Sequence, residues 1–296
     1  MEGIVELANF SLYYRYSVNE NALGAVAYRN RDSAFCGSLV HDFELNLLVV
    51  YEVEWDEPAV QHIQGLDKSF QLISVSLQEL QEGLMNGEDS MIIRCLLNGD
   101  LIKDTDGRIS QLRRDFLRFS GSLKEQKQFI GFARFLRHYV DTKTHLRHKN
   151  MLDAYQSITE SLRYWACIEL IDRDIHPEFA IWEQVSGLNT PVRKLYEELT
   201  LSSETLLQRI ELVLLACEFS VLSRMADYSA PLVRILRSRK LPWTIQELML
   251  HPAMEPVLDD LPLMIRKLSY RSIIHEEAGW KESLRPGWDH IRYYAI

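Results

Sequence analysis

The chain has 296 residues, of which 47% are hydrophobic and 25% are charged, and its formal net charge is −9. This length allows two or three domains with hydrophobic cores, and the composition is typical of a soluble globular protein. The longest apolar runs, such as Leu45 to Tyr51, fall short of the roughly 18 residues that a membrane-spanning helix needs, so we expect no membrane segment.

The charge is unevenly distributed along the chain. Residues 1–121 contain 10 basic and 19 acidic residues, whereas residues 122–226 contain 13 and 14, and residues 227–296 contain 10 and 9. The acidic first third argues against a nucleic-acid backbone as its partner and favours a face that attracts cations. Glu2 and Glu6 stand where a secretory signal would carry basic residues, and the four cysteines match neither a zinc site nor a disulfide framework. We therefore expect a cytoplasmic protein.

The first third, residues 1–121, is predicted to be a mixed α/β domain. Alternating and branched apolar side chains predict its strands, and apolar spacing of three and four residues predicts its helices. The expected strands are Ala22–Tyr28, Asp42 to about Val53 and Phe70–Val75, and the expected helices are Leu77–Leu84 and Ser90–Leu97.

Two acids stand at the start of the second predicted strand. Because alternate side chains of a strand share a face, Asp42 and Glu44 are expected to project together, about 6.5 to 7 Å apart. Carboxylate oxygens so placed are suitable ligands for Mg²⁺, which can in turn carry the phosphates of a nucleotide. The alternative is a strand end with two solvated acids, and spacing alone does not separate the two interpretations.

Residues 122–226 are predicted to form a helical bundle. The expected helices run through Phe129–Val140, over about Asn150–Ile171, from Pro191 to Leu199, and over Leu206–Met225 with a cap from Ser202 or Ser203. On the first helix, Arg134, Arg137 and His138 share a face that can meet a triphosphate or a nucleic-acid backbone. A solvated helix face is the alternative, and His176 is interpreted as a turn or capping residue.

Residues 227–296 are predicted to form a winged helix-turn-helix. The expected order is a helix over Leu232–Leu236, an extended Pro242–Thr244, a helix over Ile245–Leu250, a longer helix from Val257 to Leu268 bent at Pro262, and a strand over Arg271–His275. Arg266, Lys267 and Arg271 are the positions that such a domain would use against DNA phosphates. Winged helices also serve as dimer or docking modules, so both uses stay open.

Several stretches resemble known proteins. Asp42-Phe43-Glu44 opening a strand, followed later by Leu97–Ile102, is similar to the minimal core of the polymerase-β-like nucleotidyltransferases. Leu152–Ile158, Trp182–Val185, Thr244–Leu248 and Leu263–Leu268 resemble a bacterial family described as nucleotidyltransferase-like. The resemblance covers nearly the whole chain. It implies an α+β fold, in which a nucleotidyltransferase-like α/β domain precedes a helical substrate-binding-like domain and a helix-turn-helix. It also implies Asp42 and Glu44 as catalytic carboxylates, with Mg²⁺ and a nucleoside triphosphate.

The sequence departs from the nucleotidyltransferase pattern in two places. The usual Gly-Ser at the end of the first strand is replaced by Ala27-Tyr28-Arg29. The remaining Gly37-Ser38 lies only four residues before Asp42, where it either touches a phosphate or forms a simple turn. The strand expected beside the two acids, Gln71–Ser76, carries no third carboxylate, although two-metal chemistry needs ligands that converge on one point.

Two functions from different classes therefore stay open. The first is transfer of a nucleotidyl group from a nucleoside triphosphate, bound with Mg²⁺ at Asp42 and Glu44, to an unknown acceptor. The second is a non-catalytic regulatory protein that senses a nucleotide or binds DNA through its winged helix. The sequence indicates neither the acceptor nor the oligomeric state.

Overall fold

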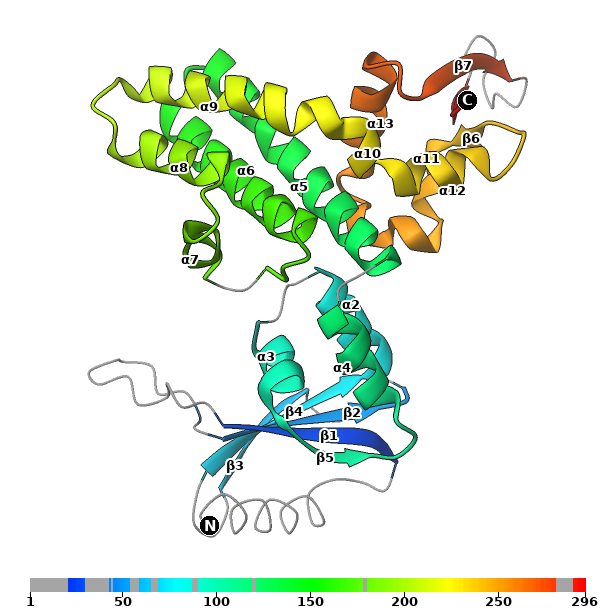
Figure 1. Cartoon of the computed structure of the whole chain (residues 1–296). Helices are drawn as coiled ribbons and strands as arrows, with labels where there is room; N and C mark the ends of the chain where they lie inside the picture. The colour runs from blue at the N-terminus through cyan, green and yellow to red at the C-terminus, as the bar shows by residue number, and fades with distance from the viewer. Residues whose placement is uncertain are drawn as a thin grey trace. The chain divides into compact units, whose positions relative to one another are not determined.

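The computed structural model describes residues 21–29, 43, 45–53, 59–64, 69–86, 90–118, 121–177, 180–280 and 290–296. The chain divides into two compact units, unit 1 (Met1–Phe119) and unit 2 (Ser120–Ile296) (Figure 1). The boundary predicted between residues 226 and 227 lies inside unit 2, and this division stays a prediction. Within the described ranges, no helix is both long and apolar enough to cross a bilayer.

Unit 1 is built on a mixed five-stranded sheet in the order β3-β4-β2-β1-β5. β2 and β4 are parallel, and the other neighbouring strands are antiparallel. Three helices, α2, α3 and α4, lie on one face of this sheet (Figure 1). The elements are β1 (Ala22–Arg29), β2 (Leu45–Tyr51), β3 (Val60–Gln64), β4 (Ser69–Ser76), α2 (Leu77–Asn86), α3 (Ser90–Asn98), β5 (Asp100–Asp104) and α4 (Arg108–Arg118).

The centre of the sheet is apolar on both faces. Leu47, Val49 and Ala25 belong to a buried cluster on one face, while Leu48 and Val50 alternate with them on the other. This continuous run of branched side chains is typical of a strand that is buried on both sides. The central strands can therefore position the polar residues at their ends firmly.

Most of the predicted elements of unit 1 are confirmed, with two differences. The described part of β2 ends at Tyr51 and not at about Val53, and the expected start of this strand at Asp42 lies outside the described residues. Three elements were not predicted, namely the edge strands β3 and β5 and the helix α4.

Unit 2 begins with two long helices that lie side by side and run in opposite directions (Figure 1). Shorter helices pack around them. The helical elements are α5 (Ser122–Arg147), α6 (Met151–Asp172), α7 (Ile181–Ser186), α8 (Pro191–Leu201), α9 (Leu206–Ser220), η1 (Leu222–Arg224), α10 (Met225–Tyr228) and α11 (Ala230–Arg237). Thr205 and Gln208 form a capping box that begins α9, so the cap predicted at Ser202 or Ser203 is wrong. The predicted helix over Leu206–Met225 is interrupted after Ser220.

The last part of unit 2 alternates short helices with strands. Its elements are β6 (Trp243–Thr244), α12 (Ile245–Met249), η2 (Pro252–Val257), α13 (Leu261–Tyr270), β7 (His275–Trp280) and β8 (His290–Tyr294). β6, β8 and β7 form a three-stranded sheet in that order. Pro262 lies in the first turn of α13 and does not bend a longer helix. The strand predicted over Arg271–His275 begins only at His275, because residues 271–274 form turns that lead into β7.

One hydrophobic core runs through the whole of unit 2. Phe132 of α5 and Trp165 of α6 belong to the same buried cluster as Leu236 of α11, Met264 of α13 and Tyr293 of β8. The C-terminal elements therefore share one core with the long helices α5 and α6.

Candidate functional site

The residues predicted to bind a metal ion and a nucleotide in unit 1 lie outside the described residues. These are Asp42, Glu44, Gly37 and Ser38. The structure does describe Phe43 and the strand that follows it, and so defines the start of β2 next to them.

A row of polar side chains crosses four strands at the start of β2. Asn46 pairs with Tyr28 of β1 on one side and with Gln71 of β4 on the other, and Gln71 pairs with His62 of β3. Residues that are directly paired in neighbouring strands project from the same face of a sheet. We call these four residues the polar row. It lies on the face that bears α2, α3 and α4, because Asn46 alternates with Leu47 of the opposite cluster.

Asn46 is the unusual member of the polar row. Its side chain is fully buried, with 0% exposed, yet it satisfies only part of its hydrogen-bonding capacity. Its Nδ2 donates to the Phe43 carbonyl at 3.2 Å, and its Oδ1 has no hydrogen-bond partner among the described residues. The Phe43 ring in turn lies 4.6 Å from the His62 ring. A buried amide oxygen without a partner costs about 1–3 kcal/mol, so its retention suggests a use.

Two described carboxylates of unit 1 have structural roles. Glu52, at the far end of β2, forms an ion pair with Arg108. Asp104 accepts hydrogen bonds from the Ile109 and Ser110 amides, at 3.2 and 2.9 Å, and thereby caps α4. Burial acts to raise the pKa of Asp104, but these hydrogen bonds outweigh it and lower the pKa. β4, the parallel neighbour of β2, carries no acid, and no group of three potential metal ligands occurs among the described residues.

The two arginines predicted to meet a triphosphate lie on α5 in unit 2. Arg137 forms an ion pair with Asp260, whose side chain is 7% exposed. Burial raises the pKa of Asp260, and the charge of Arg137 opposes this shift. Arg134 contributes to the same electrostatic environment. Arg137 is therefore already engaged in joining α5 to the start of α13.

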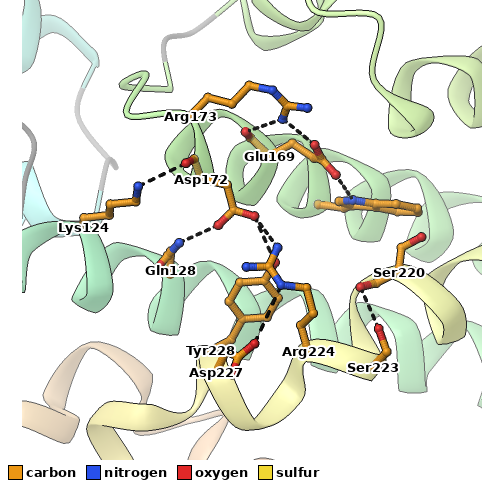
Figure 2. Close-up of polar contacts among 11 residues, drawn as sticks. Lys124, Gln128, Glu169, Asp172, Arg173, Ser220, Ser223, Arg224, Asp227 and Tyr228 are labelled. Atoms are coloured by element: carbon orange, nitrogen blue, oxygen red, sulfur yellow. Dashed lines mark hydrogen bonds and ion pairs between the residues drawn. The ribbon is translucent and has the colours of Figure 1, made fainter.

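A larger polar network ties three parts of unit 2 together (Figure 2). Asp172, at the end of α6, accepts hydrogen bonds from Gln128 at 2.6 Å, Arg224 at 2.5 Å and Tyr228 at 3.2 Å. Its backbone carbonyl also accepts from Lys124 at 3.1 Å. The Asp172 carboxylate accepts hydrogen bonds from donors on α5, η1 and α10, and it therefore links the end of α6 to these three elements.

A buried lysine lies beside a histidine in the same unit. Lys127 Nζ is 3.2 Å from Nε2 of His176, and burial lowers the pKa of Lys127 to about 8 and that of His176 to about 4. The His176 carbonyl accepts from Gln184 at 3.0 Å. His176 therefore helps to fix the irregular segment before α7, and its interpretation as a turn or capping residue stays a prediction.

A cavity of about 330 Å³ opens between the start of α5, α11 and the start of η2. Its wall includes Phe129, Ile235 and His251. It also includes an ion pair in which Arg234 Nη2 donates to Glu125 Oε2 at 2.6 Å. Polar side chains such as Ser122 and Gln126 also line it, so the wall of the cavity is mixed.

The residues predicted to contact nucleic acid lie on or after α13. Arg266 forms an ion pair with Glu276 of β7, at 2.7 Å. Burial, and then the nearby charges of Arg271 and Lys143, lower the pKa of Lys267. Arg271 is exposed at the turn after α13. The three residues therefore differ in environment, since Arg266 is paired with an acid and Lys267 lies among other cations.

The comparisons with known proteins agree with this architecture. Residues 6–124 match a protein-family model described as nucleotidyltransferase-like, and residues 125–224 match one described as a YgxA-like substrate binding domain. The chain is 29% identical over 265 residues to the uncharacterized protein YgxA of Bacillus subtilis (strain 168), with 89% of each chain covered. It also resembles the crystal structure of a nucleotidyltransferase-like protein from Exiguobacterium sibiricum 255-15, with a TM-score of 0.83, 26% identity and 99% of both chains covered.

Unit 1 thus has a nucleotidyltransferase-like fold, as the resemblance implied. Neither family model extends beyond residue 224, so the implied helix-turn-helix stays a prediction. The polar row was not predicted from the sequence. Its one visible signal is that Asn46 continues the alternation of Asp42 and Glu44.

Proposed function

Because residues 6–124 match nucleotidyltransferase-like proteins, we propose that unit 1 binds Mg²⁺ and a nucleoside triphosphate beside the start of β2. The observation that best supports this proposal is Asn46, whose buried Oδ1 has no partner among the described residues. A ligand or its bound water would satisfy this oxygen. Asp42 and Glu44 would hold the metal ion, and oxygen donors of this kind suit a hard cation.

The reaction that we propose is nucleotidyl transfer. When bound, Mg²⁺ would offset the negative charge of the phosphates. An acceptor hydroxyl attacks the α-phosphorus in line, a new P–O bond forms, the bond to the bridging oxygen breaks, and pyrophosphate leaves. The hydroxyl proton passes to solvent or to a carboxylate. Residues 125–224 match a YgxA-like substrate binding domain, and we expect them to contribute to binding of the unknown acceptor.

Isothermal titration calorimetry with the full chain tests this proposal. Each of the four ribonucleoside triphosphates is titrated with and without Mg²⁺, and we expect Mg²⁺-dependent binding of at least one of them. Asp42→Asn/Glu44→Gln should abolish the heat. Asp100→Asn, an exposed acid at the start of β5 in the same sheet, should leave it unchanged. Absence of heat for every triphosphate would remove the nucleotide-binding function.

A second candidate function is DNA binding by the last part of unit 2. The order α11, β6, α12, α13, β7 and β8, with a three-stranded sheet β6-β8-β7, supports a winged helix-turn-helix in which α13 would enter the major groove. A gel-shift titration with duplex DNA at low and moderate salt tests it. We expect a salt-sensitive complex that is weakened in Lys267→Ala. Failure to shift any duplex at low salt would exclude this function.

A further inference from the structure

The ends of α5 and α13 bring basic residues together from distant parts of the sequence. Arg137 on α5 forms an ion pair with Asp260, which begins α13. α13 packs against α5 along this contact, and Lys143 donates a hydrogen bond to Glu218 of α9. Lys143 follows Arg137 by six residues and Lys267 follows Asp260 by seven, and both lysines lie within electrostatic range of each other and of Glu218. At 1.5 Å per residue these intervals are about 9 and 10.5 Å, so the two helices run in the same direction along this contact.

Each helix carries a second basic residue one turn further along. Arg147 follows Lys143 by four residues on α5, and Arg271 follows Lys267 by four residues at the end of α13. Residues four apart on a helix lie on the same side. Lys143, Arg147 and Arg271 are exposed, so three of these four cations face solvent. We call these four residues the basic array.

One carboxylate lies within the basic array. Glu218 of α9 accepts a hydrogen bond from Lys143 at 2.9 Å and another from Tyr139. Hydrogen bonds from Tyr139 and Lys143, and then the nearby charges of Lys143 and Lys267, lower its pKa. The four cations outnumber this acid, so the array keeps an excess of positive charge. This is unfavourable for the isolated protein, because like charges that are close together repel each other.

An aromatic side chain adjoins the basic array. Tyr270 is 80% exposed, and Lys267 Nζ lies 5.8 Å from the centre of its ring. Tyrosine hydroxyls, lysines and arginines are frequent partners of phosphate oxygens in protein–DNA complexes. Arg266, by contrast, is paired with Glu276 and is less available to an anion.

From this arrangement we propose that the basic array binds the phosphate backbone of duplex DNA, so that α5 extends the DNA-binding surface beyond the winged helix. This inference rests on the second candidate function, because α13 contributes half of the array. A phosphate that contacts Lys143 must compete with Glu218 for this lysine, so Glu218 weakens DNA binding. Lys267 and Arg271 contribute more to DNA binding than Arg266 does.

The test is the salt dependence of DNA binding by the full chain. Fluorescence anisotropy with a labelled duplex of about 30 base pairs gives the slope of log K against log salt concentration. Each phosphate contact contributes about 0.9 to this slope. Arg147→Gln should therefore lower it by about 0.9, and Lys143→Gln should do the same. Lys194→Gln on α8, an exposed lysine elsewhere in unit 2, should leave it unchanged.

A variant that is expected to strengthen DNA binding controls for loss of binding through misfolding. Glu218→Gln removes the competing charge and should tighten binding by about two- to fivefold. If Lys143→Gln unfolds the protein, Arg147→Gln still tests α5, because Arg147 is exposed. If Lys267→Gln weakens binding while Arg147→Gln and Lys143→Gln keep the wild-type slope, the role of α5 is refuted and the winged helix stands. If the wild-type chain binds no duplex, or binds single-stranded RNA equally well, the proposal for duplex DNA fails.

Discussion

The substitution Asn46→Leu tests whether Asn46 is present for the stability of unit 1 or for its proposed binding function. Leucine has nearly the same shape as asparagine but no polar atoms. The hydrogen bond from Nδ2 to the Phe43 carbonyl is lost, which costs about 1 kcal/mol. Removal of the unsatisfied Oδ1 stabilises unit 1 by about 2 kcal/mol. Burial of two methyl groups in place of an amide stabilises it by about 1 kcal/mol more. We therefore expect the free energy of unfolding of unit 1 to rise by about 2 kcal/mol.

Hydrogen–deuterium exchange of the β2 amides measures this change within unit 1. An increase of about 2 kcal/mol slows exchange through unfolding by roughly 30-fold. The same variant should bind Mg²⁺ and nucleoside triphosphate at least tenfold more weakly in calorimetry. Such a gain in stability with a loss of binding is typical of a residue that is kept for function.

Asn46→Asp gives the contrasting result. It places a buried carboxylate in the polar row, which should destabilise unit 1 by about 3 kcal/mol in the absence of metal. Added Mg²⁺ should restore much of this loss. The reasoning is refuted if Asn46→Leu destabilises unit 1 while nucleotide binding is unchanged, because the amide would then be purely structural.

Three further predictions concern the fold. Gly99→Ala should lower the thermal midpoint, because a Cβ there would lie 2.5 Å from the Cys95 carbonyl oxygen, whereas Gly83→Ala in α2 has open space and should stabilise its helix by about 0.5–1 kcal/mol. Asp172→Ala should lower the free energy of unfolding of unit 2 by about 2–3 kcal/mol in urea denaturation followed by tryptophan fluorescence, since charged hydrogen bonds are lost. The hydrogen bond from Arg239 lowers the pKa of Glu247 from 4.5 to about 2, so its stabilisation is present above pH 4.5 and is lost as the pH falls towards 2. The difference in urea midpoint between wild type and Glu247→Gln should shrink over that range.

The central elements of unit 1 could be predicted from the sequence, and its edges could not. β2 is a nearly continuous run of branched apolar side chains, and β1 and β4 are largely buried with apolar side chains of their own, so these three strands carry a clear apolar signal. β3 and β5 are short edge strands with mostly exposed or half-buried side chains, so their sequences carry little apolar signal. The helix α4 follows an acidic turn and has few buried residues, Ile109 and Phe116 among them.

The candidate sites depended on information that local patterns do not contain. The polar row can be recognised only when the register of four strands is known. Gln71 and His62 become candidate site residues because they are paired beside Asn46. The basic array likewise requires the packing of α5 against α13. Pro262 shows the same limit on a smaller scale, because a proline can either bend a helix or begin one, and the neighbouring residues decide which.

The single core of unit 2 has a consequence for any shortened form of the chain. The Phe132 ring lies 5.7 Å from that of Tyr228, and Leu236 and Met264 complete the same buried cluster. A fragment that stops at residue 226 would expose several such side chains to water, at about 1.5–3 kcal/mol each. Excision of residues 227–296 should therefore give two aggregation-prone pieces, and the helical bundle needs its C-terminal neighbour in order to remain folded.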